Sequence, residues 1–327
     1  MSTHPNEIRR PSAPPASTQP ATIHRGSISA AATMDRLATA VIYAGATLVV
    51  AIVGLIFFFL LRESAPFFEQ RSLWSLLWGE KWYPLEPDEA FGALPLIGGT
   101  TLTTLIAVLL ALPVGLLCAT FLGEIAGGRT QALLKSVVEL LAGVPSVVIG
   151  FVGMALLAPW MRETLKLNTG LTALTGGALL SLMALPTIIS ISEDALHAVP
   201  RDYRLGSLAL GATPLQTIWR ITVPSARRGI LAALMLGVGR AIGETMTVLM
   251  TTGNAASLPS KLMAPVADNS VLQSVRTLTA TIAAEMGETA QGTIHYHALF
   301  ALGVVLFVIT FMVNTLADIA ISSGRRS

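Results

Sequence analysis

Six long apolar stretches, separated by shorter polar segments, constrain this chain more than any other feature of its sequence. A helix that crosses a bilayer needs about 20 consecutive, mostly apolar residues, and each stretch reaches that length. They cover residues 37–61, 93–122, 136–160, 171–192, 229–252 and 298–321. We therefore predict an all-α, polytopic membrane protein with six transmembrane helices, whose first span is a retained anchor.

The composition excludes other classes of protein. Only 12% of the residues are charged and the mean hydropathy is +0.67, whereas soluble domains carry about a quarter charged residues. This excludes a soluble globular enzyme, a disordered chain and a nucleic-acid-binding domain. We expect the chain to lie in a lipid bilayer and to bind no nucleic acid. Residues 1–34 have too little apolar surface to fold, and we expect a disordered tail there, a membrane domain over 35–322 and a second tail over 323–327.

The distribution of basic residues predicts the orientation of the spans. With six spans, 13 Lys and Arg residues lie on the side that holds both termini and seven lie on the other side. Because basic residues are enriched in cytoplasmic loops, both termini are predicted to be cytoplasmic. Residues 193–228 then form a cytoplasmic segment, and the segment around 253–296 lies outside.

Two groups of residues outside the spans are candidates for binding. Trp74, Trp78 and Trp82 follow one another at intervals of four, so they could share one face of a short helix at the membrane interface. His295 and His297 are two residues apart, which makes their rings diverge on a helix. We expect no metal site there.

The cytoplasmic segment, residues 193–228, has local signals for two short helices. The first is expected to end at Gly211, because glycine accepts the left-handed conformation that follows a helix. The second would begin with a capping box of Thr213 and Gln216 and stop at Pro224. Several leucines on this pair have few charges among them, so we expect a partner protein to cover it.

The fifth span contains two charged residues, Arg240 and Glu244. Four residues apart on one helix, they would lie on the same face. Each costs at least about 2.5–3.5 kcal/mol in hydrocarbon, so they should face the bundle interior or water. Two alternatives stay open: an ion pair that fixes helix packing, or an arginine that binds an anion with the carboxylate beside it.

Prolines predict breaks in two other spans. Pro145 with Ser146 interrupts the third span, and Pro186 with Thr187 interrupts the fourth. A proline frees a backbone carbonyl, which neighbours, hydroxyl groups or water must satisfy. Ser146 and Thr187 could do so. The breaks would either line a substrate path or merely kink the helices.

The spacing within the cytoplasmic segment resembles the EAA loop of ABC-importer permeases. In that loop Glu-Ala-Ala is followed by three residues, a glycine, nine further residues and then Ile-x-Leu-Pro. The matching positions here are Leu205, Gly206, Ser207, Gly211, Ile221 and Pro224. The glutamate of the motif is absent. The resemblance implies the type I permease fold and a coupling helix that docks on an ATP-binding subunit and transmits its closure to the spans.

Other segments look like the PstC family of phosphate-permease subunits. These segments are residues 91–100, 139–146, 237–254, 285–288 and 306–310. The resemblance implies a bacterial inner-membrane phosphate importer with a PstA-like second permease subunit, a PstB-like ATPase dimer and a periplasmic phosphate-binding protein. In that family the positions of Arg240 and Glu244 are associated with phosphate passage.

The sequence contains no Gly-x-x-x-x-Gly-Lys-Ser/Thr motif, the usual phosphate cradle for ATP. We therefore expect no enzyme activity and no cofactor in this chain, with ATP bound by a partner polypeptide. Two alternatives to a phosphate permease remain at this stage. One is an ABC permease for molybdate, tungstate or sulfate. The other is an ion-coupled secondary carrier that uses Glu244 or Glu139 to couple protons.

Overall fold

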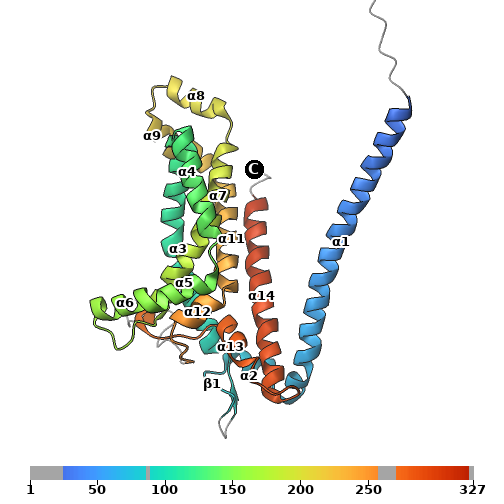
Figure 1. Cartoon of the computed structure of the whole chain (residues 1–327), viewed down its shortest axis with the longest axis vertical. Coiled ribbons are helices and arrows are strands. Elements are labelled where there is room, and N and C mark those ends of the chain that lie inside the picture. The colour runs from blue at the N-terminus through green and yellow to red at the C-terminus, as the bar shows by residue number, and fades with distance from the viewer. Residues whose placement is uncertain (1–24, 86–88, 257–269, 324–327) are drawn as a thin grey trace, which may run out of the picture. The chain divides into compact units, whose positions relative to one another are not determined.

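The computed structural model describes residues 25–85, 89–256 and 270–323 (Figure 1). It divides into two compact units, Met1–Ile56 and Phe57–Ser327. The described part of the first unit is the beginning of a helix, α1, which spans Arg25–Gln70. Its apolar side chains from Met34 to Ile56 are exposed, as expected of a helix that faces lipid.

The expected N-terminal tail is only partly within the described residues. Helix α1 begins at Arg25, so residues 25–34 are helical, and the prediction of a disordered tail is wrong for them. Residues 1–24 and 324–327 lie outside the described residues. The division into a membrane domain with two tails therefore stays a prediction.

The second unit is almost entirely helical and confirms the all-α fold class. Its helices up to the middle of the chain are α2 (Leu73–Trp78), α3 (Leu94–Thr120), α4 (Gly128–Ala142), α5 (Ser146–Val152), α6 (Ala158–Leu165) and α7 (Ala173–His197). They are followed by α8 (Arg201–Ala209), α9 (Pro214–Thr217), α10 (Val223–Ser225), α11 (Arg227–Gly243), α12 (Met246–Thr251), α13 (Leu278–Glu285) and α14 (Ile294–Ser323). Short π-helical turns cover Phe121–Ile125, Gly153–Leu157 and Ile218–Thr222, and a 3-10 turn covers Ser270–Leu272.

Five helices in the described residues are long and apolar enough to cross a membrane, and a bent helix pair makes a possible sixth span. The five are Met34–Gln70, Leu94–Ile125, Ser146–Leu165, Ala173–His197 and Ile294–Ile319. The bent pair joins Pro214–Ser225 to Arg227–Gly243 at an angle of 68°. These elements follow the order of the predicted spans.

Helices α3, α7 and α11 pack closely because small residues allow their backbones to approach. Ile188 of α7 lies between two glycines. A Cβ atom on Gly115 of α3 would come within 2.8 Å of the Ile188 side chain, and a Cβ on Gly237 of α11 would also come within 2.8 Å of it. Any larger residue at either glycine would push these helices apart.

The two ends of this helical body carry different structures (Figure 1). Helices α8 and α9 lie at one end, and α2, α13 and strand β1 lie at the other. Strand β1 (Trp82–Tyr83) pairs antiparallel with β2 (Ala90–Phe91), with Trp82 opposite Phe91. The candidate functional residues fall at these two ends and at the helix breaks between them.

Candidate functional site

The chain leaves the helical conformation between α11 and α12. Glu244 follows the last residue of α11 and has an extended backbone, with φ −72° and ψ 133°. The prediction that Arg240 and Glu244 share one face of an unbroken helix is therefore wrong. Arg240 is exposed and Glu244 is half-buried, and neither forms an ion pair within the described residues.

The predicted break in the third span is confirmed. Helix α4 ends at Ala142 and α5 begins at Ser146, because Pro145 cannot donate a backbone hydrogen bond. Glu139 and Pro145 line the same hollow of about 630 Å³ beside this break. The span-length apolar helix begins at the break, as Ser146–Leu165, rather than at residue 136.

The break between α11 and α12 contacts the break between α4 and α5 through Thr247 of α12. Its hydroxyl group lies 3.1 Å from the carbonyl oxygen of Ser146 and 3.2 Å from the sulfur of Met183. A Cβ on Gly150 of α5 would come within 3.2 Å of the Cα atom of Thr247, so α5 and α12 are in close contact. Ser146 takes part through its carbonyl, whereas its hydroxyl was expected to act. Thr247 was missed because it has no signal of its own in the sequence.

The predicted break in the fourth span is wrong. Helix α7 continues through Pro186 from Ala173 to His197. Pro186 is buried and Thr187 is half-buried, and the hydroxyl of Thr187 forms no hydrogen bond within the described residues. A proline inside a helix can be tolerated when the surrounding helices support the chain, and α7 packs against both α3 and α11.

The helix–turn–helix in the segment over 193–228 is confirmed as α8 and α9. Helix α8 ends in a Schellman motif: Gly211 has φ +83°, and Ala212 N–H donates to the carbonyl of Ser207 at 3.2 Å. Helix α9 begins with the predicted capping box of Thr213 and Gln216. The hydroxyl groups of Ser207 and Thr217 lie 2.9 Å apart and join the two helices.

The sequence predicted that the second helix of the pair stops at Pro224, and this prediction is wrong. Pro224 lies inside α10, and the chain turns by 68° only after Ser225. Helix α10, which contains Pro224, directly follows the π-helical turn Ile218–Thr222, and the helix continues through the proline to Ser225. Ile221 is half-buried and Gly206 is exposed.

The outer surface of the α8–α9 pair is apolar. Leu205 is 63% exposed and Leu210 is 91% exposed, and Leu215 of α9 is exposed as well. We call these three side chains the leucine surface. Exposed leucines at the end of a helical body, on a segment with polar neighbours, are typical of an interaction site.

Arg204 fixes α8 to the rest of the molecule. Its guanidinium group donates to both carboxylate oxygens of Glu124, at 3.1 Å and 2.5 Å. It also donates to the carbonyl of Leu196 in the last turn of α7, at 2.8 Å, and to the carbonyl of Val199 just after that helix, at 2.6 Å. No local pattern in the sequence marks this contact, because Glu124 lies 80 residues from Arg204 in the chain.

A second carboxylate at this end joins α4 to α7. Glu193 is 1% exposed. It accepts a hydrogen bond from Gln131 at 3.0 Å and pairs with Lys135 at 3.2 Å. A buried carboxylate that lost these partners would destabilise the fold, so this contact holds α4 in place.

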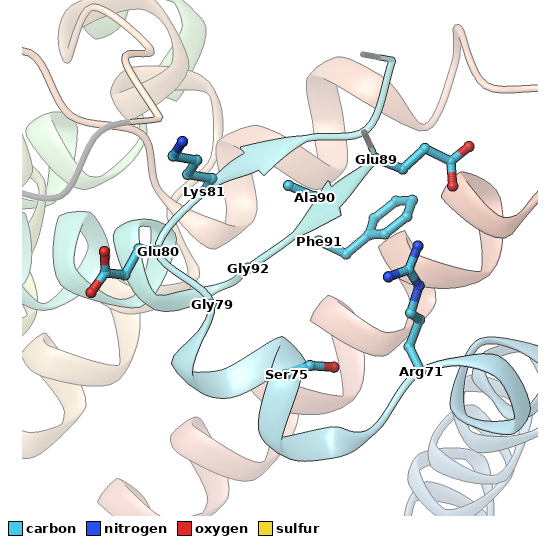
Figure 2. A pocket seen from close by; sticks show the side chains of 9 residues that line it. All are labelled: Arg71, Ser75, Gly79, Glu80, Lys81, Glu89, Ala90, Phe91 and Gly92. Atoms are coloured by element: carbon cyan, nitrogen blue, oxygen red, sulfur yellow. The ribbon is translucent and has the colours of Figure 1, made fainter. Parts of the chain in front are cut away.

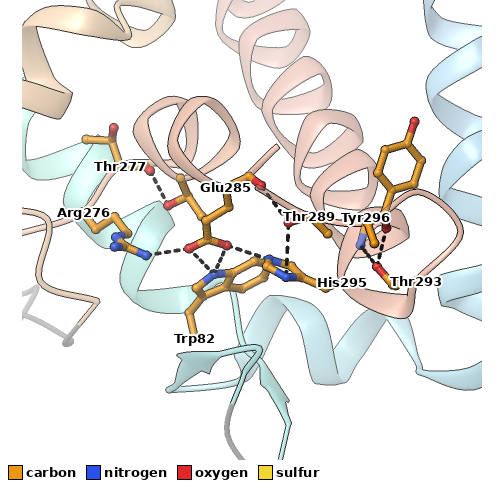
Figure 3. A network of polar contacts seen from close by, with 10 residues as sticks. Trp82, Arg276, Thr277, Glu285, Thr289, Thr293, His295 and Tyr296 are labelled. Atoms are coloured by element: carbon orange, nitrogen blue, oxygen red, sulfur yellow. Dashed lines mark hydrogen bonds and ion pairs between the residues drawn. The ribbon is translucent and has the colours of Figure 1, made fainter. Parts of the chain in front are cut away.

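The opposite end of the helical body is organised around Glu285, the last residue of α13 (Figure 3). Its carboxylate accepts hydrogen bonds from Trp82 Nε1, at 3.0 Å and 3.2 Å, and from Arg276 at 2.7 Å. The Nε2 atom of His295 lies 2.8 Å from it. These residues line a hollow of about 1050 Å³. We call Glu285, Trp82, Arg276 and His295 the Glu285 cluster.

The predicted stripe of three tryptophans is wrong in one member. Trp74 and Trp78 lie on α2 and are 68% and 66% exposed, but Trp82 lies in β1 and is only 1% exposed. Helix α2 ends at Trp78 because Gly79 is extended there. Spacing alone could not show that the chain changes from helix to strand between the second and third tryptophan.

A second hollow at this end has mixed charge (Figure 2). Its volume is about 420 Å³, and its lining includes Arg71, Lys81, Glu80 and Glu89. The Cζ atom of Arg71 lies 6.0 Å from the ring centre of Phe91, within the range of a cation–π contact. Because acidic and basic groups alternate around it, this hollow has no clear preference for an anion or a cation.

Comparison with known proteins agrees with this architecture. Residues 111–322 match the family described as binding-protein-dependent transport system inner membrane component. The probable ABC transporter permease protein YqgH of Bacillus subtilis is 40% identical over 71% of this chain and 72% of its own. The phosphate transport system permease protein PstC of Mesorhizobium japonicum is 37% identical over 74% of this chain and 76% of its own.

Further relatives and a solved structure extend the likeness. PstC 2 of Mycobacterium tuberculosis is 33% identical over 86% of this chain and 89% of its own. A structure of the MetNI methionine ABC transporter in an inward-facing conformation aligns with a TM-score of 0.50 and 17% identity, over 71% of this chain and 94% of that one. At that identity the likeness concerns the fold alone. The chain belongs to the family of binding-protein-dependent transport system inner membrane components, and it is a multi-pass ABC-importer permease subunit with relatives among the PstC phosphate permeases.

Proposed function

We propose that this chain is a permease subunit of an ATP-driven importer of inorganic phosphate. One observation carries the proposal: the α8–α9 pair presents the leucine surface at one end of the helical body and is anchored there by Arg204. The relatives named PstC support phosphate as the substrate. The chain would work with a PstA-like permease subunit, a PstB-like ATPase dimer and a periplasmic phosphate-binding protein.

The α8–α9 pair would carry the movement of the ATPase to the spans. Its leucine surface suits an apolar cleft on a partner protein, because burying exposed leucine side chains contributes about 1.5–3 kcal/mol for each one fully covered. Arg204 binds the end of α7 and Glu124, which follows α3. A displacement of α8 would therefore reach both helices. ATP hydrolysis would belong to the partner, and both termini to the cytoplasm.

The substrate path would include Arg240 and the adjoining helix breaks. Arg240 is exposed and has no carboxylate partner within the described residues. Its planar group of donors could bind a tetrahedral oxyanion with two hydrogen bonds. The hydroxyl of Thr247, which donates to the carbonyl of Ser146, comes three residues after the extended backbone of Glu244. The roles of Pro145, Pro186 and Thr187 in the path stay predictions.

The direct test is uptake by the complete complex in proteoliposomes. We expect labelled phosphate to accumulate only with ATP and the binding protein, and the purified chain to show no ATPase activity. ATP-independent uptake by this chain alone, or uptake abolished by a protonophore while ATP stays high, would contradict the proposal. Competition by excess molybdate, tungstate or sulfate that exceeds competition by unlabelled phosphate would assign another oxyanion.

The arginine can be tested in the same assay. Arg240→Gln should leave assembly with the partners intact and lower the uptake rate at least about tenfold, because a charge-assisted hydrogen bond to a substrate is worth about 1.5–3 kcal/mol. Arg162→Gln is the matched control, since Arg162 of α6 is also an exposed arginine. Equal rates in the two variants would remove Arg240 from the path.

A further inference from the structure

Helix α13 packs against α11 and α12 through Ala280, and it also donates a side-chain hydrogen bond to the break between them. The Oγ1 atom of Thr279 donates a hydrogen bond of 2.8 Å to the carbonyl oxygen of Glu244. Because the backbone of Glu244 is extended, this carbonyl lies outside the regular hydrogen-bond pattern of the helices on either side. Thr279 is only 6% exposed, so water has little access to replace it.

The direction of the neighbouring hydrogen bonds follows from counting protons. The hydroxyl groups of Thr277 and Thr279 lie 3.1 Å apart. A threonine hydroxyl has one proton, and that of Thr279 is used on Glu244. Thr277 must therefore donate to Thr279. The oxygen of Thr277 in turn accepts the backbone N–H of Ala280 at 3.2 Å, as the cap of α13.

The result is a directed chain of three hydrogen bonds, from the cap of α13 through Thr277 and Thr279 to Glu244. Each bond in such a chain polarises the next and strengthens it. The opposite end of α13 is held by the Glu285 cluster, through Trp82, Arg276 and His295. Helix α13 is therefore fixed at both ends.

We propose that Thr279 is a positioning residue, which holds Glu244 in its extended conformation at the break and so sets where this carboxylate lies in the substrate path. The inference rests on the proposed function for the part that concerns transport. The hydrogen bond and the conformation of the break can be measured independently of transport.

The chain offers a matched pair of substitutions. Thr279→Val keeps the shape of the side chain and removes its donor, and Thr279→Ser keeps the donor. Thr281→Val is the control, because Thr281 is fully buried in the same helix and its hydroxyl donates to the carbonyl of Thr277, at 2.8 Å, within its own turn. All three variants are compared with the wild type in the complete complex.

Amide hydrogen exchange over residues 243–249 is the first measurement. We expect Thr279→Val to raise the exchange rate there on the order of tenfold, because the partly buried carbonyl of Glu244 would lose its hydrogen-bond donor. Thr279→Ser and Thr281→Val should stay within about twofold of the wild type. Equal exchange in Thr279→Val and Thr281→Val, or no change in either, would overturn the proposal whether or not the complex transports phosphate.

Phosphate uptake is the second measurement. We expect Thr279→Val to lower the maximal rate on the order of tenfold, with the serine variant restoring it. An unchanged rate in Thr279→Val would overturn the role in the path. If the wild-type complex shows no ATP-driven phosphate uptake, the proposed function fails, while the exchange experiment still decides whether Thr279 holds the break. If the valine variant does not assemble, Thr279→Cys replaces it, because a thiol is a weaker donor than a hydroxyl. An exchange rate in the cysteine variant equal to that of the wild type would also overturn the proposal.

Discussion

Among the described residues, each end of the helical body has one arginine–carboxylate pair, with the arginine at the centre of one end and the carboxylate at the centre of the other. At the α8 end, Arg204 is the centre and distributes its donors to Glu124 and to backbone carbonyls around the end of α7. At the α13 end, the carboxylate of Glu285 is the centre and accepts hydrogen bonds from Trp82, Arg276 and His295. The first arrangement ties one helix to the ends of others, and the second ties several segments to one point.

The difference matters for what each end can do. A guanidinium group that holds α8 against helix ends transmits a displacement of that helix, because its donor geometry is planar and rigid. A carboxylate surrounded by donors from β1, α14 and the segment before α13 instead holds those elements in a fixed arrangement. We therefore expect variants at the α13 end to change stability first, and variants at the α8 end to change coupling first.

The largest expected effect on stability is at the centre of the Glu285 cluster. Glu285→Ala should lower the free energy of unfolding by about 3 kcal/mol, because it leaves a partly buried arginine without its partner. Glu288→Ala is the control, since Glu288 is exposed on the same segment, and it should change stability by less than about 0.5 kcal/mol. Thermal unfolding of the purified complex in detergent measures both. Equal melting temperatures would show that Glu285 is not the centre of this end.

At the α8 end, Arg204→Lys should separate ATP hydrolysis from transport. Lysine keeps the charge but cannot reach Glu124 and the two carbonyls together, so uptake should fall on the order of tenfold while the ATPase activity of the complex is kept. Arg201→Lys, at an exposed position of the same helix, should leave both activities unchanged.

Exchanging the two charges sharpens this prediction. Glu124→Arg combined with Arg204→Glu should not restore uptake, because a glutamate at position 204 cannot donate to the carbonyls of Leu196 and Val199. Full recovery would show that the ion pair matters alone and that the link to the end of α7 does not.

The smallest expected effect concerns one donor of the Glu285 cluster. Trp82→Phe keeps most of the aromatic packing and removes the indole N–H, so the free energy of unfolding should fall by about 1 kcal/mol. Trp74→Phe on the exposed face of α2 should have no measurable effect on it. If the two substitutions are equally mild, the indole contributes packing alone to this end of the molecule.

The sequence predicted the features that depend on neighbouring residues. The turn between α8 and α9 follows from Gly211 and from the capping residues Thr213 and Gln216, which act within a few residues of one another. The break before α5 follows from Gly143 and Pro145. Both predictions needed only the local limits on backbone conformation.

The errors arose where distant contacts decide the outcome. Pro186 has the same chemistry as Pro145, yet α7 continues through it, because α7 is packed between other helices. Glu244 has no strong local signal for a break, and the contact that supports its extended backbone comes from Thr279, 35 residues away. Local sequence patterns could reveal neither the continuous helix at Pro186 nor the break at Glu244.

By itself, the sequence determined that this chain is a helical membrane protein, approximately where its spans lie, and where the turn between its two short helices falls. Hydropathy and capping act over a single helix or turn, so they can be read directly from the order of residues. Only the tertiary structure decided which charged groups pair and which breaks meet. Trp82 and Glu285 are 203 residues apart, and such pairings arise only when packing brings distant segments together.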